Sequence, residues 1–406
     1  MKRALMLLMP YAGHFFTNLP LIRRMTSQGT RLLIYGSGRF REFLPAENVI
    51  VRDYPQSISE YCGNGGKWES DRDKAAYDYF SYMADSGKIL LKEQIDDEME
   101  NIVLKEMRAE SEAFEPDIIM YDTHAGFTAA LRKTLPCPRV ELNSSVYAPA
   151  LWQSESFRDF YSEILRPSYS GDTSYEQIIS MKRKRERKSR GGQERSFAYI
   201  SPLLQDEKEK LSGACSFIGF DADIAPAEHR KGIYVSRGTV AESYGAFLLR
   251  DTLHGLDGFP ADITASCGGN PLVIAALEEG GFSDNIKIRR YTDQKSMLAA
   301  SRIFITHGGI TGVREAISAH TPMIVIPANF PDYQTGRAVE KNHGGLMLRH
   351  RPIDREELQN CCIQILSRYD EYAAGVKKMA VDLKSTWFEK GLPAIEKECE
   401  RILCEG

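Results

Sequence analysis

Two series of short apolar segments, separated by longer amphipathic ones, constrain the fold of this 406-residue chain more than any other feature. In the first series, four segments have the length of strands and lack a polar face: 3–9, 31–36, 117–122 and 139–143. Strands of this kind are buried on both faces, as in parallel sheets. Segments with helical periodicity lie between them, at 19–28, 73–113 and 125–135. The alternation predicts a doubly wound α/β domain.

A second series predicts a second domain of the same class. Its six apolar segments are 232–239, 261–269, 285–292, 301–309, 321–329 and 345–349. We therefore expect two Rossmann-like domains that face a central cleft: an N-terminal domain over 1–212, a linker over 213–230 and a C-terminal domain over 231–382. The tail, 383–406, ends in an amphipathic segment that can pack on either domain. Ligands of such folds bind beyond the carboxyl ends of the strands.

Composition excludes several classes of protein. The net charge of -4 at pH 7 gives no global attraction to nucleic acid. The eight cysteines form no CxxC pair, which argues against a metal site and fits reduced thiols in the cytoplasm. No apolar stretch reaches the roughly 18 residues of a membrane span, and MKRALMLLMP lacks a signal-peptide cleavage site. We expect a cytoplasmic protein.

A strand–turn–helix unit near residue 307 has the composition of an anion site. His307 follows a predicted strand, and Gly308 and Gly309 allow a tight turn after it. A helix is predicted from about Thr311, and the N–H groups at a helix N-terminus bind phosphate. Glu315, one turn further on, can accept hydrogen bonds from the hydroxyls of a ribose. Such a turn is also common where no ligand binds, so the unit alone leaves both interpretations open.

The segment THGGITGVREAISAHTPMIVIP, at 306–327, resembles the donor-nucleotide signature of the glycosyltransferases that act on macrolides and plant secondary metabolites. Upstream, RRYTDQKSML (289–298) and YVSRGT (234–239) are similar to two further donor segments of that family. Near the N-terminus, GHFFTNLPL (13–21) is similar to the family's GH-I-N-P-T-L-P-L. The resemblance implies a GT-B fold, with the nucleotide sugar held mainly by the C-terminal domain.

The resemblance also implies a role for each residue that matches a motif position. These residues form the expected donor site: His307, Gly309, Thr311 and Gly312 at the phosphates, Glu315 at the ribose, Tyr291 at the base with Gln294 at the matching glutamine, Ser236 and Thr239 beside the diphosphate, and Asp332 with Gln334 at the sugar.

Three positions depart from the family pattern. Gly312 replaces a hydroxyl residue, and Tyr291 replaces a tryptophan. The sugar-reading pair Asp-Gln stands here as Asp-Tyr-Gln, with Gln334 in register and Asp332 displaced by one position. The motif therefore does not fix the donor sugar, and a uridine and a thymidine donor both stay open.

The resemblance places a catalytic pair at His14 and Asp122. An acceptor hydroxyl becomes a better nucleophile when a base takes its proton, and histidine is suited because it titrates near neutrality. A carboxylate on the other ring nitrogen orients the imidazole and stabilises its charged form. Both residues follow predicted strands of one domain, so they can meet at one sheet edge. Two alternatives stay open: His14 only caps a helix or bonds a carbonyl, or His124 is the base.

The leading interpretation is an inverting glycosyltransferase that needs no metal or other cofactor. It moves a sugar from a UDP- or dTDP-linked donor to a hydroxyl of a small natural product. The aromatic-rich segments 68–83 and 146–153 are expected to line the acceptor side, and the basic run 182–190 is a solvated segment or a contact for anionic lipid. The alternatives are a transferase with a membrane-lipid acceptor and a nucleotide-sugar-binding protein without activity.

Overall fold

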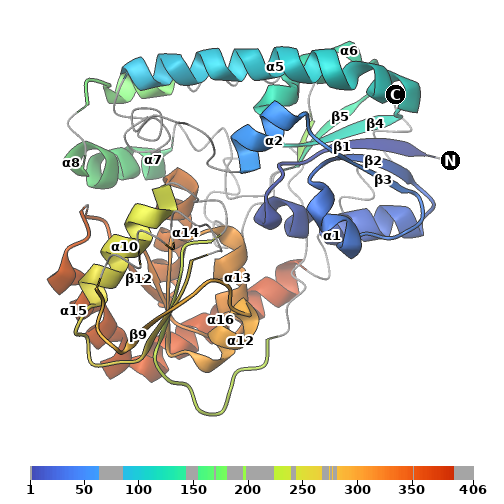
Figure 1. The fold of residues 1–406 in the computed structure, drawn as a ribbon. Coiled ribbons are helices and arrows are strands. Elements are labelled where there is room, and N and C mark those ends of the chain that lie inside the picture. Colours follow the sequence, from blue (N-terminus) through green and yellow to red (C-terminus); the bar gives the residue numbers. More distant parts are fainter. Residues whose placement is uncertain are drawn as a thin grey trace.

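The computed structural model describes most of the chain as two α/β domains, each built on a six-stranded sheet (Figure 1). The described residues are 2–63, 86–142, 154–168, 171–180, 195–197, 224–238, 244–267, 274, 277, 281–350 and 352–387. Among the described residues, all paired strands of both sheets are parallel. The expected fold class, two doubly wound Rossmann-like sheets, is confirmed.

The N-terminal sheet has the order β3-β2-β1-β4-β5-β6. Its strands are β1 Arg3–Leu7, β2 Arg31–Gly36, β3 Val49–Asp53, β4 Ile118–Asp122, β5 Arg139–Leu142 and β6 Arg195–Phe197. The four apolar segments predicted as strands are β1, β2, β4 and β5, while β3 and β6 were not predicted. The main helices of this half are α1 Ala12–Ser27, α2 Gln56–Gly63, α5 Ser86–Phe114, α6 Ala129–Thr134 and α7 Glu155–Phe160.

The C-terminal sheet has the order β12-β11-β10-β7-β8-β9. Its strands are β7 Ile233–Ser236, β8 Ile263–Ser266, β9 Ile286–Arg289, β10 Ile303–Thr306, β11 Met323–Val325 and β12 Gly345–Met347. All six coincide with predicted segments. The helices are α10 Tyr244–Leu256, α12 Gln294–Ala300, α13 Ile310–Ser318, α14 Phe330–Lys341, α15 Arg355–Ser367 and α16 Tyr369–Trp387.

Both sheets follow the same winding, 3-2-1-4-5-6 when strands are counted within each sheet. The order reverses between β1 and β4 in the first sheet and between β7 and β10 in the second. At such a switch point the connections leave in opposite directions and open a crevice at the carboxyl ends of the strands. Each domain therefore has one place where a ligand site is expected.

Strands buried on both faces explain the continuous apolar runs in the sequence. Leu5 and Met6 are adjacent on β1 and both fully buried, and they belong to core clusters on opposite faces of the sheet. Each fully buried side chain of this size stabilises the fold by about 1.5–3 kcal/mol. Because both faces carry helices, the functional residues lie at the strand ends.

One element of the N-terminal half packs on the C-terminal domain. The ring of Phe157 on α7 lies 4.8 Å from that of Phe330 on α14. Nearby, the Tyr333 hydroxyl donates to Glu163 (2.7 Å) and Arg337 pairs with Asp159 (2.6 Å). The predicted domain boundaries stay predictions, since 198–223 and 388–406, which hold most of the linker and the tail, lie outside the described residues.

Two helix predictions need correction. The helix expected over 19–28 begins much earlier, at Ala12, because burial of Phe15 and Leu19 holds the first turns although Pro20 lies inside the helix. The helix expected over 73–113 is described from Ser86 to Phe114, and 64–85 lie outside the described residues.

Candidate active site

His14 and Asp122 meet at the switch point of the N-terminal sheet. Asp122 ends β4, and His14 lies in the first turn of α1, the helix that follows β1. The Nδ1 atom of His14 lies 2.7 Å from Oδ2 of Asp122. The Asp122 side chain is fully buried, while that of His14 is 16% exposed. The pair thus has a buried carboxylate and an imidazole that is partly exposed.

The carboxylate of Asp122 is held in its ionised form. Burial alone would raise its pKa, but the charge of His14 and hydrogen bonds from His124 and His14 outweigh burial and hold the pKa well below its ordinary value. An ionised carboxylate only accepts, so the Nδ1 atom of His14 must carry the proton of their hydrogen bond. In the neutral form of the His14 ring, the Nε2 atom has no proton and can accept one.

Helix α1 fixes the position of His14 through polar side chains one turn further on. Asn18 donates from Nδ2 to the carbonyl oxygen of His14 (2.8 Å), and the Thr17 hydroxyl donates to the carbonyl oxygen of Gly13 (2.7 Å). Both side chains are buried. The base candidate therefore lies on a supported helix turn and not on the loop that the sequence suggested.

His124, the rival base, also contacts Asp122. Its backbone N–H donates to Oδ1 of Asp122 (2.8 Å), and its Nδ1 atom lies 3.3 Å from the same oxygen. The rings of His14 and His124 lie edge to face, with centroids 5.1 Å apart. The two histidines therefore use different oxygens of one carboxylate.

The turn after β10 has the geometry of an anion site. Gly308 has a φ of 98°, in the left-handed region, and a Cβ there would lie 2.8 Å from Cγ1 of Val325. The helix α13 then begins at Ile310, with Gly309 as its N-cap. The N-cap residue is a glycine, so it makes no side-chain capping hydrogen bond. The first N–H groups of α13 are therefore available to an anion.

The imidazole of His307 is enclosed beside this turn. A Cβ on Gly238 would lie 2.8 Å from its Cε1 atom, and one on Gly309 would clash with its Nε2 atom. The Nδ1 atom of His307 is buried and has no hydrogen-bond partner among the described residues. Burial, with the positive charge of Arg237, lowers the pKa of His307 to about 3. His307 is therefore a neutral hydrogen-bond donor at neutral pH.

Arg237 is a site residue that the sequence did not predict. It follows β7, the other strand of this switch point, and is 3% exposed. Its Nη1 atom donates to the carbonyl oxygen of Ile326 (3.2 Å). Arg237 brings a buried positive charge to the expected diphosphate pocket. Its place directly after a central strand, inside the YVSRGT segment, was the available signal.

Glu315 lies in a chain of hydrogen-bonded side chains. The sequence predicted only Glu315 and Gln294 of this chain as site residues. Gln294 donates from Nε2 to Oε2 of Glu315 (2.5 Å) and accepts from the hydroxyl of Tyr234 (3.4 Å). That hydroxyl also lies 2.9 Å from Oγ1 of Thr292. Burial raises the pKa of Glu315, and the bond from Gln294 opposes the rise. Gln294 therefore orients Glu315, and Tyr234 orients Gln294.

The remaining predicted donor residues lie around the same sheet edge. Ser236 ends β7 opposite Thr306, and its side chain is buried. Tyr291 follows β9 with 70% of its surface exposed, so its ring is free to stack on a base. Gly312 faces Phe304 and Gln294 at ordinary contact distance. Thr239 lies outside the described residues.

Asp332 and Gln334 lie near the start of α14, and Asp332 is close to the turn at Gly308 and Gly309. Oδ2 of Asp332 accepts from the N–H of Ala328 (3.2 Å), and Asp332 is next to Gly308. Gln334 is 1% exposed, and neither polar atom of its amide has a partner among the described residues. A buried amide without a partner costs free energy, so Gln334 keeps hydrogen-bonding capacity for a ligand.

The two halves of the site meet at one close contact between domains. A Cβ on Gly13 of α1 would lie 3.3 Å from Oγ1 of Thr311 on α13. The first turns of these two helices therefore face each other, and His14 is the residue next to the contact. The absence of a side chain at Gly13 allows this approach.

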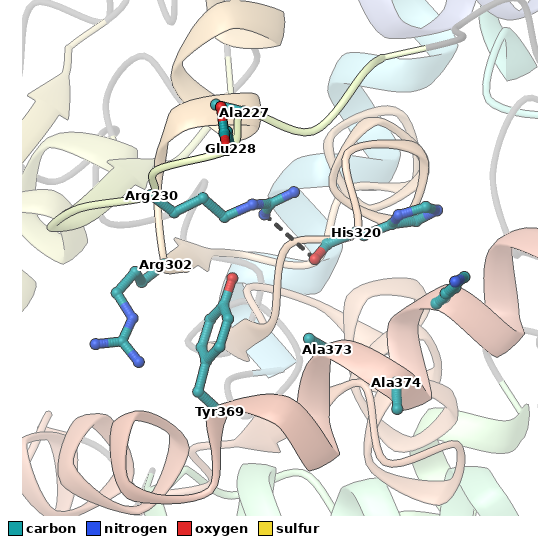
Figure 2. Close-up of a pocket in the computed structure, with 9 residues that line it drawn as sticks. Ala227, Glu228, Arg230, Arg302, His320, Tyr369, Ala373 and Ala374 are labelled. Atoms are coloured by element: carbon teal, nitrogen blue, oxygen red, sulfur yellow. Dashed lines mark hydrogen bonds between the residues drawn. The ribbon is translucent and has the colours of Figure 1, made fainter.

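Figure 2 shows a pocket whose lining includes none of the predicted site residues. It has a volume of about 390 Å³ and includes Arg230, Arg302 and His320 in its lining. Arg302 precedes β10 and His320 follows α13, so the pocket lies at the amino edge of the sheet. Arg230 donates to the carbonyl oxygen of His320 (3.3 Å), which satisfies the end of α13. We assign the pocket no part in the site.

Solved structures with the same fold are natural-product glycosyltransferases. The calicheamicin glycosyltransferase CalG4 matches with a TM-score of 0.65 and 16% identity, over 100% of this chain and 99% of that chain. The spinosyn rhamnosyltransferase SpnG matches with a TM-score of 0.64 and 14% identity, over 98% and 100% of the two chains. At these identities the likeness shows the fold, which is the GT-B fold of two facing Rossmann-like domains.

The sequence comparisons identify the class of enzyme. Residues 250–385 match the glycosyltransferase family 28 C-terminal domain. The uncharacterized UDP-glucosyltransferase YdhE of Bacillus subtilis (strain 168) is 29% identical over 207 residues, which is 47% of this chain and only about half, 49%, of YdhE. YojK of the same organism, also a UDP-glucosyltransferase by name, is 21% identical over 95% of this chain and 94% of its own. The chain is a glycosyltransferase of the GT-B type.

Among the helices that the structure describes, none combines the length and apolar character needed to cross a membrane.

Proposed function

We propose that the protein is an inverting, metal-independent glycosyltransferase. It moves a sugar from a UDP- or dTDP-linked donor to a hydroxyl of a small natural-product acceptor. His14 is the general base, Asp122 orients it, and the residues around His307 hold the donor diphosphate. The observation that carries this proposal is the 2.7 Å contact between His14 and Asp122 beside the anion turn of the other domain.

The reaction balances with His14 as proton acceptor. The acceptor hydroxyl gives its proton to Nε2 of His14 while its oxygen forms a bond to the anomeric carbon. The bond from that carbon to the diphosphate oxygen breaks on the opposite face, so the configuration inverts. Asp122 stabilises the imidazolium that forms, as in hydrolase triads. A positioned base of this kind contributes about 10²–10⁴ in rate.

The leaving diphosphate gains negative charge as the bond breaks. The N–H groups at the start of α13 and the neutral imidazole of His307 supply hydrogen bonds to it, and Arg237 supplies positive charge. Because these groups are fixed before the reaction, they need no reorganisation as the charge develops. The donor set thus provides the stabilisation that a divalent cation gives in other transferases.

Glu315, Tyr291 and the amide of Gln334 extend the donor site along the sheet edge. Gln294 occupies one oxygen of Glu315, which leaves the other for ribose hydroxyls. The exposed ring of Tyr291 suits a nucleobase, and Gln334 suits a sugar hydroxyl. The relatives named as UDP-glucosyltransferases favour uridine, whereas SpnG has been solved with thymidine diphosphate, so both donors belong to the proposal.

Fewer described residues bear on the acceptor side of the proposal than on the donor side. The segments 68–83 and 146–153, expected to line it, and the basic run 182–190 lie outside the described residues. A membrane-lipid acceptor therefore remains an alternative, and it is tested by measuring salt-dependent binding of the protein to anionic liposomes. The non-catalytic alternative is opposed by the His14–Asp122 pair, because a protein that only binds nucleotide sugars has no use for a base. A cytoplasmic location stays a prediction.

The test is a transfer assay with UDP-α-glucose and dTDP-α-glucose, a panel of phenolic and macrolide acceptors, and excess EDTA. We expect transfer to survive EDTA and the product to carry the β-linkage in its NMR spectrum. An α-linked product would contradict the inverting mechanism. Loss of transfer in EDTA with rescue by Mg²⁺ or Mn²⁺ would contradict the metal-independent account.

A further inference from the structure

One carboxylate at the site has two histidine neighbours, and the proposed reaction uses only one of them. Asp122 contacts Nδ1 of His14 with Oδ2 (2.7 Å) and Nδ1 of His124 with Oδ1 (3.3 Å). The second histidine is held in place, because its backbone N–H also donates to Oδ1 (2.8 Å). Orienting the base requires one carboxylate and one imidazole, so His124 is left without a role in transfer.

The three side chains together form a set of metal ligands. Two imidazole nitrogens and one carboxylate oxygen all lie within 4.8 Å of one another. Zn²⁺ binds nitrogen at about 2.0–2.1 Å and carboxylate oxygen at about 2.0–2.2 Å, which puts neighbouring ligand atoms of a tetrahedral site about 3.3 Å apart. The Nδ1 atoms of His14 and His124 lie 2.7 and 3.3 Å from the two different oxygens of Asp122, so each imidazole is already close to that spacing from the carboxylate.

Burial and support also fit a metal site with one open side. The Asp122 side chain is fully buried, whereas those of His14 and His124 are 16% and 35% exposed. The carboxylate sits on a central strand, and His14 on a supported helix turn. An ion could enter from the crevice and keep a water as its fourth ligand, as in zinc sites with three protein ligands.

We propose that His14, Asp122 and His124 bind Zn²⁺ or a similar divalent transition metal, and that this ion inhibits transfer. The inhibitory part rests on the proposed role of His14 as the base. When the metal binds Nδ1 of His14, the proton that Nδ1 carried moves to Nε2, and the ring stays neutral. The nitrogen that faces the acceptor then cannot accept a proton. The metal is an inhibitor here, so the proposal agrees with metal-independent catalysis.

His124 distinguishes this site from an ordinary histidine–carboxylate pair. Without it, His14 and Asp122 offer two ligands, which is one fewer than zinc sites of this kind use. The chain supplies a matched control in His350, whose Nδ1 lies 3.2 Å from Oε2 of Glu357 in the C-terminal domain. His350 is 71% exposed and belongs to a two-ligand pair.

The experiment measures metal binding to the full chain after EDTA treatment and dialysis. Zn²⁺ is titrated by calorimetry into the wild type, His124→Ala, His14→Ala and His350→Ala, and Co²⁺ binding is followed by visible absorption. We expect His124→Ala and His14→Ala to weaken Zn²⁺ binding at least tenfold and to remove the strong bands of tetrahedral Co²⁺. His350→Ala should bind like the wild type. Equal affinity in the wild type and His124→Ala would overturn the proposal.

The activity arm compares each variant with itself, as the ratio of rates with and without Zn²⁺. We expect Zn²⁺ to inhibit the wild type and His350→Ala, and His124→Ala to need at least tenfold more Zn²⁺ for the same inhibition. Site-specific Zn²⁺ binding without inhibition would overturn the inhibitory part. If His14→Ala loses Zn²⁺ affinity but keeps its transfer rate, the base assignment fails and the metal site stands. If it loses transfer while every variant binds Zn²⁺ alike, the metal site fails and the base stands.

Discussion

His14 and His307 both follow a central strand at a switch point, yet one faces a carboxylate and the other a guanidinium. In the N-terminal sheet the histidine follows β1 and the carboxylate of Asp122 ends β4. In the C-terminal sheet the histidine follows β10 and Arg237 follows β7. The two sheets share one winding, and the sign of the neighbouring charge separates their chemistry.

The difference suits opposite proton roles. A carboxylate stabilises the imidazolium that His14 becomes after accepting a proton. Burial and the charge of Arg237 disfavour the imidazolium of His307 and lower its pKa to about 3, so this ring stays neutral and can only donate or accept a hydrogen bond. We infer that the same residue type acts as a base in one domain and as a fixed dipole in the other. The variants below test that division, from the largest expected effect to the smallest.

The first prediction removes the base. His14→Ala should lower the transfer rate by roughly 10²–10⁴, or about 3–5.5 kcal/mol of barrier, while the donor affinity stays close to that of the wild type. The measurements are initial rates at saturating donor and calorimetry with the nucleoside diphosphate. His350→Ala, on the exposed surface, is the control and should keep both values. A near wild-type rate for His14→Ala would make His124 the next candidate for the base.

The second prediction removes the neutral donor. His307→Ala should lower kcat by about 10², more than it weakens donor binding, because the phosphate charge grows in the transition state. His307→Gln keeps a hydrogen-bond donor and should recover part of the rate. Equal losses in binding and turnover would show that His307 acts on the bound donor only and has no special effect on the leaving group.

The third prediction concerns Glu315. Glu315→Ala should weaken nucleoside diphosphate binding by about 1–3 kcal/mol, because ribose hydroxyls and Gln294 lose a charged partner. The transfer rate at saturating donor should change much less. Calorimetry that finds unchanged affinity, with thermal unfolding confirming an intact fold, would remove Glu315 from the donor site.

The fourth prediction follows from the depressed pKa of His307. The unfolded chain binds a proton at this residue below about pH 6.5, whereas the folded chain does so only below a pKa of about 3. The contribution of His307 to the free energy of unfolding is therefore present above about pH 6.5 and is lost as the pH falls towards 3. The loss is about 2 kcal/mol between pH 8 and pH 5. Urea unfolding at several pH values should show this slope in the wild type and a smaller one in His307→Gln. Equal slopes would contradict the neutral state of His307 in the folded chain.

Much of the fold followed from hydrophobic pattern, and the exceptions have physical causes. Strands such as β2 and β10 were predicted because burial on both faces gives continuous apolar runs. β3 was not predicted because its burial is partial and because Arg52 and Asp53 interrupt the apolar pattern. The start of α1 was not predicted because Gly13 and Pro20 are poor helix formers. In the structure, tertiary packing overrides their low helix propensity.

Site residues that lie in a sequence motif could be predicted. Site residues that only the strand order brings together could not. The resemblance gave His14, Asp122 and the residues of the anion turn, and the structure brings the pair to 2.7 Å. Arg237 and Tyr234 lie inside the YVSRGT segment, but the motif gives neither of them a role, and their hydrogen-bond partners Ile326 and Gln294 are far away in sequence. The contact between Gly13 and Thr311 depends on how two domains meet, which no local pattern encodes.

The central claim is that His14 and Asp122 act as one unit, and a double-mutant cycle tests it most directly. Initial transfer rates at saturating donor are compared for His14→Ala, Asp122→Asn and the double variant. Asp122→Asn should slow transfer because an amide can favour the wrong tautomer of the imidazole. We predict that the double variant is little slower than His14→Ala alone, since Asp122 acts only through His14. Two single losses that multiply in the double variant would contradict the account.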